Sequence, residues 1–288
     1  MTLVNAWDPI AVGRSIVDFP PRPPLARGYR PDTVADGWAS GPFAVRAASV
    51  RGYLHRFHGT PRQDDLALAV HPGTDTLVLA IADGVSSAVH AHVGAAVVCR
   101  FAVESLLDTL DAGGTIDWVE LLRGAAWALV EQAQRHLGRA EPDPASAEET
   151  MSTTLLAGVV RAAPGGGIHA SLVQVGDASA WLLRGGAFTT VIRGKPDAVL
   201  PSTVVALPRV PASVEPIEVD VPPGGVLLIG TDGLGDAIGD GGGELGALFV
   251  EHLATAPPPP LGLAHLLDFS RETFDDDRTL VAIWPQNG

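Results

Sequence analysis

Short runs of apolar or alternating residues, each bounded by turn residues, recur along the chain and predict β-strands. The segments with this pattern are 43–50, 66–71, 76–82, 152–161, 168–175, 178–183, 188–192, 214–219, 225–229 and 279–284. Turns rich in Gly or Pro separate most neighbouring runs, so we expect antiparallel hairpins.

Longer apolar segments with helical spacing predict helices between the two groups of strands and near the end of the chain. Residues 88–110 are almost wholly apolar, are too long for a strand and contain no proline. Thr115 is a good N-cap for a second helix over 116–136. Two shorter helices are expected at 244–255 and 261–269. This order of elements predicts an α+β layered domain built around antiparallel sheets.

Other segments lack such periodicity. Residues 1–42 are rich in Pro, Gly and Arg, and we expect them to form an extended tail or a wrap on the surface. A polyproline stretch of this kind could also bind a partner domain. Residues 139–149 are predicted as a polar loop, and residues 194–213 as an irregular excursion. We therefore divide the chain into an N-terminal extension, 1–42, and one domain, 43–288.

The charge balance argues against two classes of partner. The chain has 288 residues, with 19 Lys and Arg against 33 Asp and Glu, and a net charge of −14. This charge repels phosphate backbones and anionic lipids, so neither nucleic acid nor a membrane is expected as a partner. No apolar stretch approaches the about 20 residues of a membrane span, and no signal-peptide pattern opens the chain. We expect a cytoplasmic monomer, in which the single Cys99 is buried and inert.

Two predicted strands end in an Asp-Gly pair. Asp83-Gly84 follows the apolar strand 77–82, and Asp232-Gly233 follows the apolar strand 226–229. Each carboxylate is thereby held at the end of a rigid strand, while the glycine lets the backbone turn sharply and offers a carbonyl to a bound ion.

Three further acids occupy similar positions. Asp64 precedes a predicted strand, Asp177 lies in a Val-Gly-Asp turn, and Asp276 precedes the last strand. Any one of them alone is most simply interpreted as a turn former or a helix cap. If the strand ends converge, however, the carboxylates repel by about 1 kcal/mol or more per close pair, and bound cations would relieve that repulsion. Oxygen ligands without nearby His or Cys patterns point to Mg²⁺ or Mn²⁺.

Six short motifs resemble, in order, those of the protein phosphatase 2C family of metal-dependent Ser/Thr phosphatases. They are Gln63-Asp64, Ala82-Asp83-Gly84-Val85-Ser86-Ser87, Met151-Ser152-Thr153-Thr154-Leu155, Val175-Gly176-Asp177-Ala178-Ser179-Ala180, Thr231-Asp232-Gly233-Leu234-Gly235-Asp236 and Asp276-Asp277-Arg278-Thr279-Leu280. The resemblance implies a four-layer α-β-β-α sandwich, in which two antiparallel β-sheets are flanked by pairs of helices. It also implies a two-metal centre in a cleft at one end of the sandwich.

The resemblance further implies a set of metal ligands: Asp64, Asp83, the Gly84 carbonyl, Asp177, Asp232 and Asp276. In the family's pattern Asp83 would bridge both ions, and Asp177 would help Asp232 to bind a third. Two ions about 3.5–4 Å apart lower the pKa of a bridging water and neutralise a phosphoryl group attacked in line by the resulting hydroxide. No covalent phosphoenzyme is then required.

Departures from the family pattern leave the phosphate contact and the proton donor open. The family's phosphate-binding arginine has no clear equivalent, and the segment before Asp64 resembles a bacterial subgroup with Gly-x-x-His followed by Gly-x-Pro-x-Gln-Asp. His55, Arg56 or Arg62 could contact the phosphate, or each could be an ordinary basic surface residue. The eukaryotic general-acid histidine is missing after Asp83, so His55, His90 or a metal-bound water would donate that proton.

We therefore expect a phosphatase of bacterial signalling, acting on phosphoserine or phosphothreonine proteins, with Asp83, Asp232, His55, Arg56 and Arg62 as its catalytic residues. The missing arginine, and Ser86 in place of the family's second glycine, leave open an alternative, a catalytically silent phosphatase fold that binds phosphorylated partners. A metal-dependent phosphomonoesterase for a small molecule is a third possibility. Turnover separates the first two, since both would bind metal.

Overall fold

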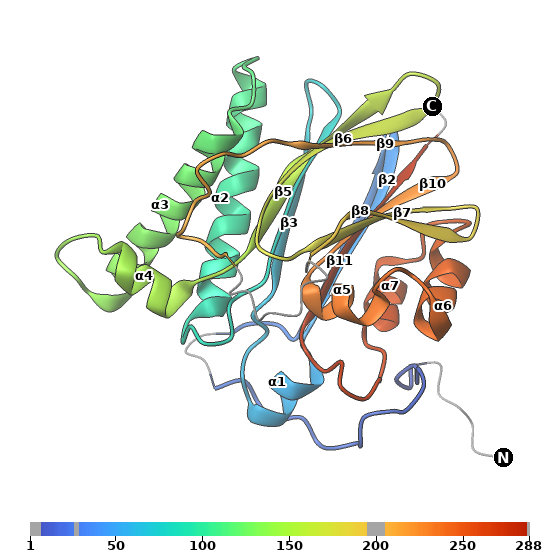
Figure 1. The fold of residues 1–288 in the computed structure, drawn as a ribbon, viewed down its shortest axis with the longest axis horizontal. Helices are drawn as coiled ribbons and strands as arrows, with labels where there is room; N and C mark the ends of the chain where they lie inside the picture. The colour runs from blue at the N-terminus through green and yellow to red at the C-terminus, as the bar shows by residue number, and fades with distance from the viewer. Residues whose placement is uncertain (1–6, 26–28, 195–204, 287–288) are drawn as a thin grey trace.

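The strands form two antiparallel sheets in the computed structural model, which describes residues 7–25, 29–194 and 205–286 (Figure 1). The six-stranded sheet has the order β1 (Thr33–Ser40), β2 (Phe43–Val50), β11 (Arg278–Pro285), β10 (Gly225–Gly230), β7 (Ser179–Arg184), β8 (Ala187–Ile192). The five-stranded sheet has the order β3 (Asp65–His71), β4 (Thr76–Ala82), β5 (Leu155–Ala163), β6 (Gly167–Val175), β9 (Ile217–Val221).

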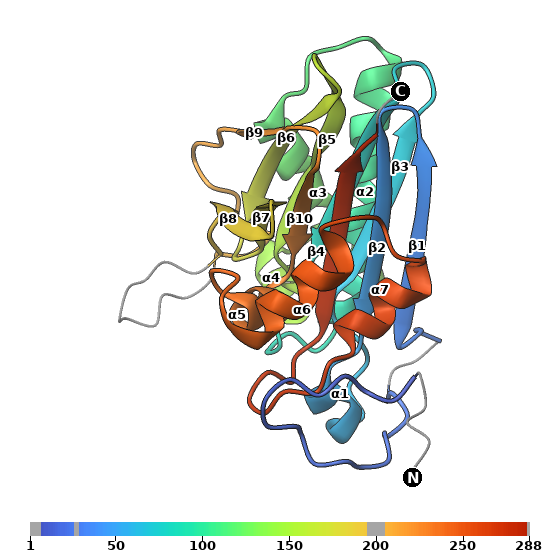
Figure 2. The ribbon, with the colours of Figure 1, turned by 90° about the vertical axis from the view of Figure 1, so that its right-hand side faces the viewer.

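Helices cover the outer face of each sheet, and a separate apolar core fills each of the three interfaces. The core between the sheets contains side chains of β2, β4, β10 and β11. Helices α2 (Ala91–Asp111), α3 (Trp118–Leu137) and α4 (Pro144–Met151) pack on the five-stranded sheet. Helices α5 (Asp232–Ile238), α6 (Gly243–Leu253) and α7 (Pro260–Leu267) pack on the six-stranded sheet. The four-layer α-β-β-α sandwich is thus confirmed; Figure 1 shows the layers side by side, and Figure 2 views them from the side of α5, α6 and α7.

Polar caps define the helices that pack on the five-stranded sheet. Asp117, rather than Thr115, caps α3, because its carboxylate accepts hydrogen bonds from the first backbone amides of the helix. Asp143 caps α4 in the same way, and Pro144 occupies the first turn. The segment 139–149, expected to be a loop, therefore contains most of a short helix. Its sequence pattern did not predict this helix because apolar periodicity is weak in eight residues.

The N-terminal segment enters the fold earlier than expected. Residues 33–40, assigned to the extension from the sequence, form β1 and pair with β2 from Thr33 opposite Val50 to Ser40 opposite Phe43. Helix α1 (Tyr53–His58) was also not predicted, and it lies at the end of the sandwich where the N-terminal segment passes around it (Figure 2). Both elements depend on tertiary contacts more than on local periodicity.

The segment between β8 and β9 is only partly described. Strand β9 begins at Ile217, later than the expected 214, and residues 195–204 of the expected irregular excursion lie outside the described residues. Within the described parts of the chain, no helix has the length and apolar character needed to cross a membrane.

Candidate metal centre

Three of the predicted ligands meet at neighbouring strand ends. Asp83 directly follows β4, Asp177 comes two residues after β6, and Asp232 begins α5 after β10. One carboxylate oxygen of each lies within 4.8 Å of the others. Asp177 is buried, whereas Asp83 and Asp232 are partly exposed. A cation placed among these oxygens would be reachable from solvent and surrounded by the donors that Mg²⁺ and Mn²⁺ prefer.

The backbone around Asp83 is held by the segment after α4. The Asp83 amide donates to the Thr154 hydroxyl at 2.9 Å, and its carbonyl accepts from the Thr154 amide at 2.7 Å and the Thr153 hydroxyl at 2.8 Å. A Cβ at Gly84 would lie 2.7 Å from the Cβ of Ala91. The close approach of α2 therefore requires glycine here, which agrees with the predicted Asp-Gly corner.

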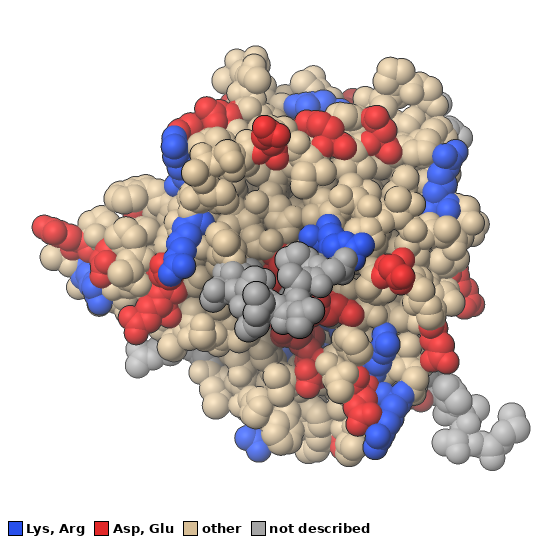
Figure 3. Space-filling view, viewed as in Figure 1, with Lys and Arg blue, Asp and Glu red and all other residues tan. Residues whose placement is uncertain are grey.

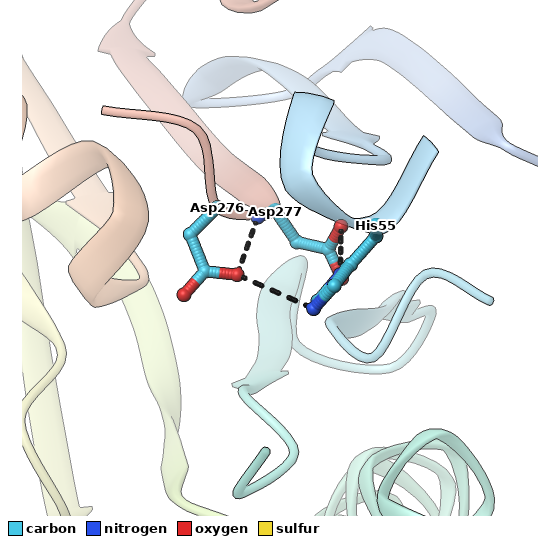
Figure 4. A group of neighbouring side chains, drawn as sticks. All are labelled: His55, Asp276 and Asp277. Carbon is cyan, nitrogen blue, oxygen red and sulfur yellow. Dashed lines mark hydrogen bonds and ion pairs between the residues drawn. The ribbon is translucent and has the colours of Figure 1, made fainter. Parts of the chain in front are cut away.

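A second group of side chains forms at the start of β11, where His55 of α1 meets two consecutive acids (Figure 4). His55 Nδ1 lies 2.8 Å from an Asp277 oxygen, and Nε2 lies 3.8 Å from an Asp276 oxygen. The Asp277 amide donates to the Asp276 carboxylate at 2.8 Å. Asp276 was predicted as a metal ligand, whereas no role was assigned to Asp277 from the sequence.

Asp277 joins three segments of the chain. Its buried carboxylate accepts hydrogen bonds from the Gly52 amide at 2.6 Å and the Gln63 amide at 2.5 Å. Burial raises the pKa of Asp277, but the ion pair with His55 and the two amides outweigh it, so the pKa lies below its usual value. Burial lowers the pKa of His55, and Asp277 reverses this, so the pKa is raised. The two residues therefore form a buried ion pair.

Asp64 is buried, and two hydroxyls donate to its carboxylate. The Thr231 and Thr279 hydroxyls both donate to the same Asp64 oxygen at 2.7 Å. Burial, followed by the charge of Asp277, raises the pKa of Asp64 to about 8. Burial in the same way raises the pKa of Asp83, with further contributions from the charges of Asp64, Asp232 and Asp276. These carboxylates thus belong to one electrostatically coupled region.

The clustered carboxylates of this region are suited to bind divalent cations. Burial and then the charge of Asp277 raise the pKa of Asp276 to about 6, as expected where a carboxylate is buried close to like charges. Hydroxyls and backbone amides donate hydrogen bonds to the Asp64 and Asp277 carboxylates and hold them in place despite the cost of the repulsion. Bound divalent ions would remove this cost. Figure 3 shows several acidic side chains close together near the middle of one face of the molecule.

Two of the basic residues predicted to contact phosphate, Arg56 and Arg62, are engaged in contacts within the fold. Arg62 is buried, and its guanidinium donates to the Ser49 hydroxyl and to the carbonyls of Pro31 and Asp64. Arg56 pairs with the Asp268 carboxylate at 2.8 Å. These placements give both arginines structural contacts and do not support the phosphate-contact hypothesis for Arg62.

The two histidines considered as proton donors lie in different surroundings. His55 adjoins the carboxylate region through Asp276 and Asp277. His90 precedes α2 and meets the His136 ring, with 4.2 Å between ring centroids. Of the two, His55 therefore has the geometry closer to the candidate centre.

Comparison with known proteins identifies the family. The profile of protein phosphatase 2C matches residues 51–256, and the chain belongs to this family. The family comprises metal-dependent Ser/Thr phosphatases, which are hydrolases. The motifs from Gln63-Asp64 to Asp232-Gly233 all lie inside the matched range, as the resemblance predicted. No match was found among the curated proteins.

Solved structures show the same fold. The Ser/Thr phosphatase PstP/Ppp of Mycobacterium tuberculosis matches with a TM-score of 0.54 and 19% identity, over 86% of this chain and 100% of that one. PppA, a regulatory component of the type VI secretion system of Pseudomonas aeruginosa, has a TM-score of 0.54 and 18% identity, over 85% and 99%. The catalytic domain of PstP with two manganese ions has a TM-score of 0.53 and 20% identity, over 85% and 99%.

Proposed function

We propose that this protein is an active phosphatase that removes phosphate from phosphoserine or phosphothreonine in protein substrates of bacterial signalling. The observation that carries the proposal is the convergence of Asp83, Asp177 and Asp232 within 4.8 Å at three strand ends. Three carboxylates held this close together repel one another, and a role in binding cations explains why the fold brings them together. Membership of the protein phosphatase 2C family supports the same assignment.

In this proposal two ions, Mg²⁺ or Mn²⁺, are held by Asp83, Asp232, Asp276, the Gly84 carbonyl and Asp64, and Asp177 adds a ligand for a third. Bound divalent ions would supply charge neutralisation for the phosphoryl group and acidify coordinated water. The chain's own part is to fix the carboxylates. The Asp64 carboxylate is oriented by two threonine hydroxyls, and the backbone that carries Asp83 is held by Thr153 and Thr154.

His55 is the side chain best placed to hold a proton near the leaving group. Its pKa is raised because Asp277, and then Asp276, outweigh the effect of burial. The imidazolium form is therefore favoured, and its Nε2 lies on the side of Asp276 at 3.8 Å. We assign Asp277 the task of orienting this ring, and His55 the task of donating the proton.

We assign to the substrate a cavity of about 210 Å³, whose lining includes Trp181, Arg193 and Asp236. Gly194 packs so closely on the Asp177 carbonyl that a Cβ there would lie 1.9 Å from it, so the chain next to Arg193 passes close to the backbone of Asp177. With Arg62 engaged elsewhere, we assign the contact with substrate phosphate to Arg193.

The test is hydrolysis of p-nitrophenyl phosphate and of a phosphothreonine peptide, with and without Mn²⁺. Wild type is compared with Asp83→Asn, Asp232→Asn and the exposed control Asp75→Asn. We expect Mn²⁺-dependent turnover in wild type and in the control, and loss of turnover in the two site variants. Mn²⁺ binding by calorimetry without turnover of either substrate would refute the proposal and favour the alternative, a silent module that binds phosphorylated partners.

Two further parts of the proposal concern where and how the protein acts. We propose that it works in the cytoplasm as a monomer, where a buried thiol such as Cys99 stays reduced. Sedimentation of the purified chain tests the monomer, and fractionation of expressing cells tests the location.

A further inference from the structure

The N-terminal residues 7–25 and 29–32, here called the N-terminal strap, run along the end of the sandwich that carries α1 (Figures 1 and 2). The proposed function assigns no role to this segment. The strap contacts three segments, each of which leads directly to a residue of the candidate centre.

The first contact is with the segment between α7 and β11. The Val12 amide donates to the Ser270 carbonyl at 3.0 Å, and the Ser270 amide donates to the Ile10 carbonyl at 2.8 Å. The Ile16 amide donates to the Ser270 hydroxyl at 2.9 Å. These bonds fix the chain a few residues before Asp276.

The second contact is with α1. The Phe19 ring meets the rings of Tyr53 and Phe57 edge to face, with centroids 6.4 Å and 5.5 Å apart. The Arg22 amide donates to the Arg56 carbonyl at 2.9 Å. His55 lies on this same short helix, which has six residues and therefore depends on such contacts for its position.

The third contact is with the segment that carries Asp64. The Arg30 guanidinium donates to the Asp64 carbonyl at 2.7 Å and to the Arg62 carbonyl at 2.6 Å, and pairs with the Asp65 carboxylate at 3.4 Å. Only 14% of the Arg30 side chain is exposed. A largely buried guanidinium with three partners holds this segment in one place.

The three contacted segments converge on Asp277, whose carboxylate binds the amides of Gly52 and Gln63 and pairs with His55. On this basis we propose that the N-terminal strap is a positioning element of the metal centre. It holds α1, the segment that carries Asp64 and the segment before Asp276 in the positions that place their side chains for metal binding. The inference rests on the proposed function and assigns positioning roles to Phe19 and Arg30.

The strap is largely separate from the cores that stabilise the domain. Val12 lies in the core of the six-stranded sheet and Ile10 packs against it, whereas the contacts of Phe19 and Arg30 described above are with segments at the end of the sandwich. Substitution at Phe19 or Arg30 should therefore change the site more than the global stability.

The experiment compares full-length wild type with Phe19→Ala and Arg30→Gln. Phe19→Tyr is the conservative variant, which keeps the ring, and Val17→Ala is the matched control, because Val17 lies on the same strap and is 84% exposed. Four quantities are measured: Mn²⁺ affinity by calorimetry, kcat and KM with p-nitrophenyl phosphate, and the melting temperature in EDTA. Hydrogen exchange of residues 52–64 in EDTA reports the position of α1 without metal.

We expect Phe19→Ala and Arg30→Gln to weaken Mn²⁺ binding about tenfold, as loss of support behind metal ligands typically does, and to lower kcat with little change in KM. Exchange of residues 52–64 should rise, while Phe19→Tyr and Val17→Ala should behave as wild type. Wild-type Mn²⁺ affinity in both variants, or a loss that only follows a fall in melting temperature, would overturn the proposal.

The outcomes separate this proposal from the function on which it rests. A wild-type chain that binds Mn²⁺ and turns over neither substrate overturns the phosphatase assignment, and the strap is then judged by Mn²⁺ affinity and hydrogen exchange alone. A wild-type chain that binds no Mn²⁺ overturns both.

Discussion

Replacing Asp64 with Asn should stabilise the metal-free protein while weakening its response to metal. Asp64 is fully buried, and both threonine hydroxyls donate to one of its oxygens. The carbonyl oxygen of Asn can accept these same two bonds, so Asp64→Asn removes the charge and keeps the local hydrogen bonds. Any change in stability then reports the cost of the carboxylate.

The magnitude follows from the pKa of Asp64, which is about 8 in the fold against an ordinary value of 3.8. Between these values the folded chain binds a proton that the unfolded chain has released, so wild-type stability falls as pH rises from 3.8 to about 8. The ceiling at pH 7 is about 4 kcal/mol, at about 1.36 kcal/mol per pH unit. We expect about 2 kcal/mol, because Asp64 shares its protons with neighbouring acids.

The assay is urea and thermal unfolding of wild type, Asp64→Asn and Asp75→Asn in EDTA, at about pH 5 and about pH 8. Asp75 is an exposed turn residue with φ of 48°, a conformation that Asn also adopts, so its variant makes the same chemical change without burial. A gain of about 2 kcal/mol corresponds to roughly 4 °C in melting temperature for a chain of this size.

The advantage of Asp64→Asn should grow from the lower to the higher pH. In Mn²⁺ at about 100 times its Kd, wild type should gain about 2.7 kcal/mol, and the variant should gain less. Equal stabilities of wild type and Asp64→Asn at both pH values in EDTA would refute the reasoning, because the carboxylate would then be ionised at no cost.

Three further predictions concern other parts of the fold. Asp277→Asn should lower the pKa of His55, because burial then acts without its main opposing partner; an unchanged imidazole titration by NMR would contradict the ion pair. Gly94→Ala should lower the free energy of unfolding in urea by about 2 kcal/mol, because the new Cβ would lie 2.1 Å from a backbone oxygen. Gly262→Ala is the control, since its Cβ would make only ordinary contacts, and it should be neutral or stabilising. Equal effects of the two substitutions would refute this prediction. Burial lowers the pKa of His92 to about 4, so the stability of the wild-type chain falls as the pH drops from 6.5 toward 4. The His92→Gln variant should lose about 1 kcal/mol less free energy of unfolding over that range. Coincident acid-unfolding curves of the two chains would argue against this.

The N-terminal region and α1 are the parts of the fold that local sequence signals specify least. The composition of residues 1–42 indicated an extended surface segment, but could not indicate that residues 33–40 pair with β2 as an edge strand. The six-residue α1 carries no periodic signal of its own, and Tyr53 and Phe57 on it are contacted by Phe19 from the strap. Such short elements are selected by packing rather than by local propensity.

Some residues of the candidate site can likewise be predicted from local sequence, whereas others cannot. Strand-end acids followed by glycine can be recognised locally, because a buried apolar run that stops at Asp-Gly defines both a rigid support and a turn. This local pattern is sufficient to nominate Asp83 and Asp232 as candidate ligands. The roles of Arg62 and Asp277 have no such local signal, since they depend on which backbone amides and carbonyls surround each buried charge.

The sequence by itself determined the α+β layering and the order of its acid-bearing strand ends, because hydrophobic period and turn residues act over a few neighbouring positions. Only the tertiary structure decided which carboxylates face one another, which one is neutralised by His55, and that the N-terminal strap reaches the Asp64 segment through Arg30. Those facts depend on contacts between residues far apart in the chain, whose energies arise from burial and charge at close range.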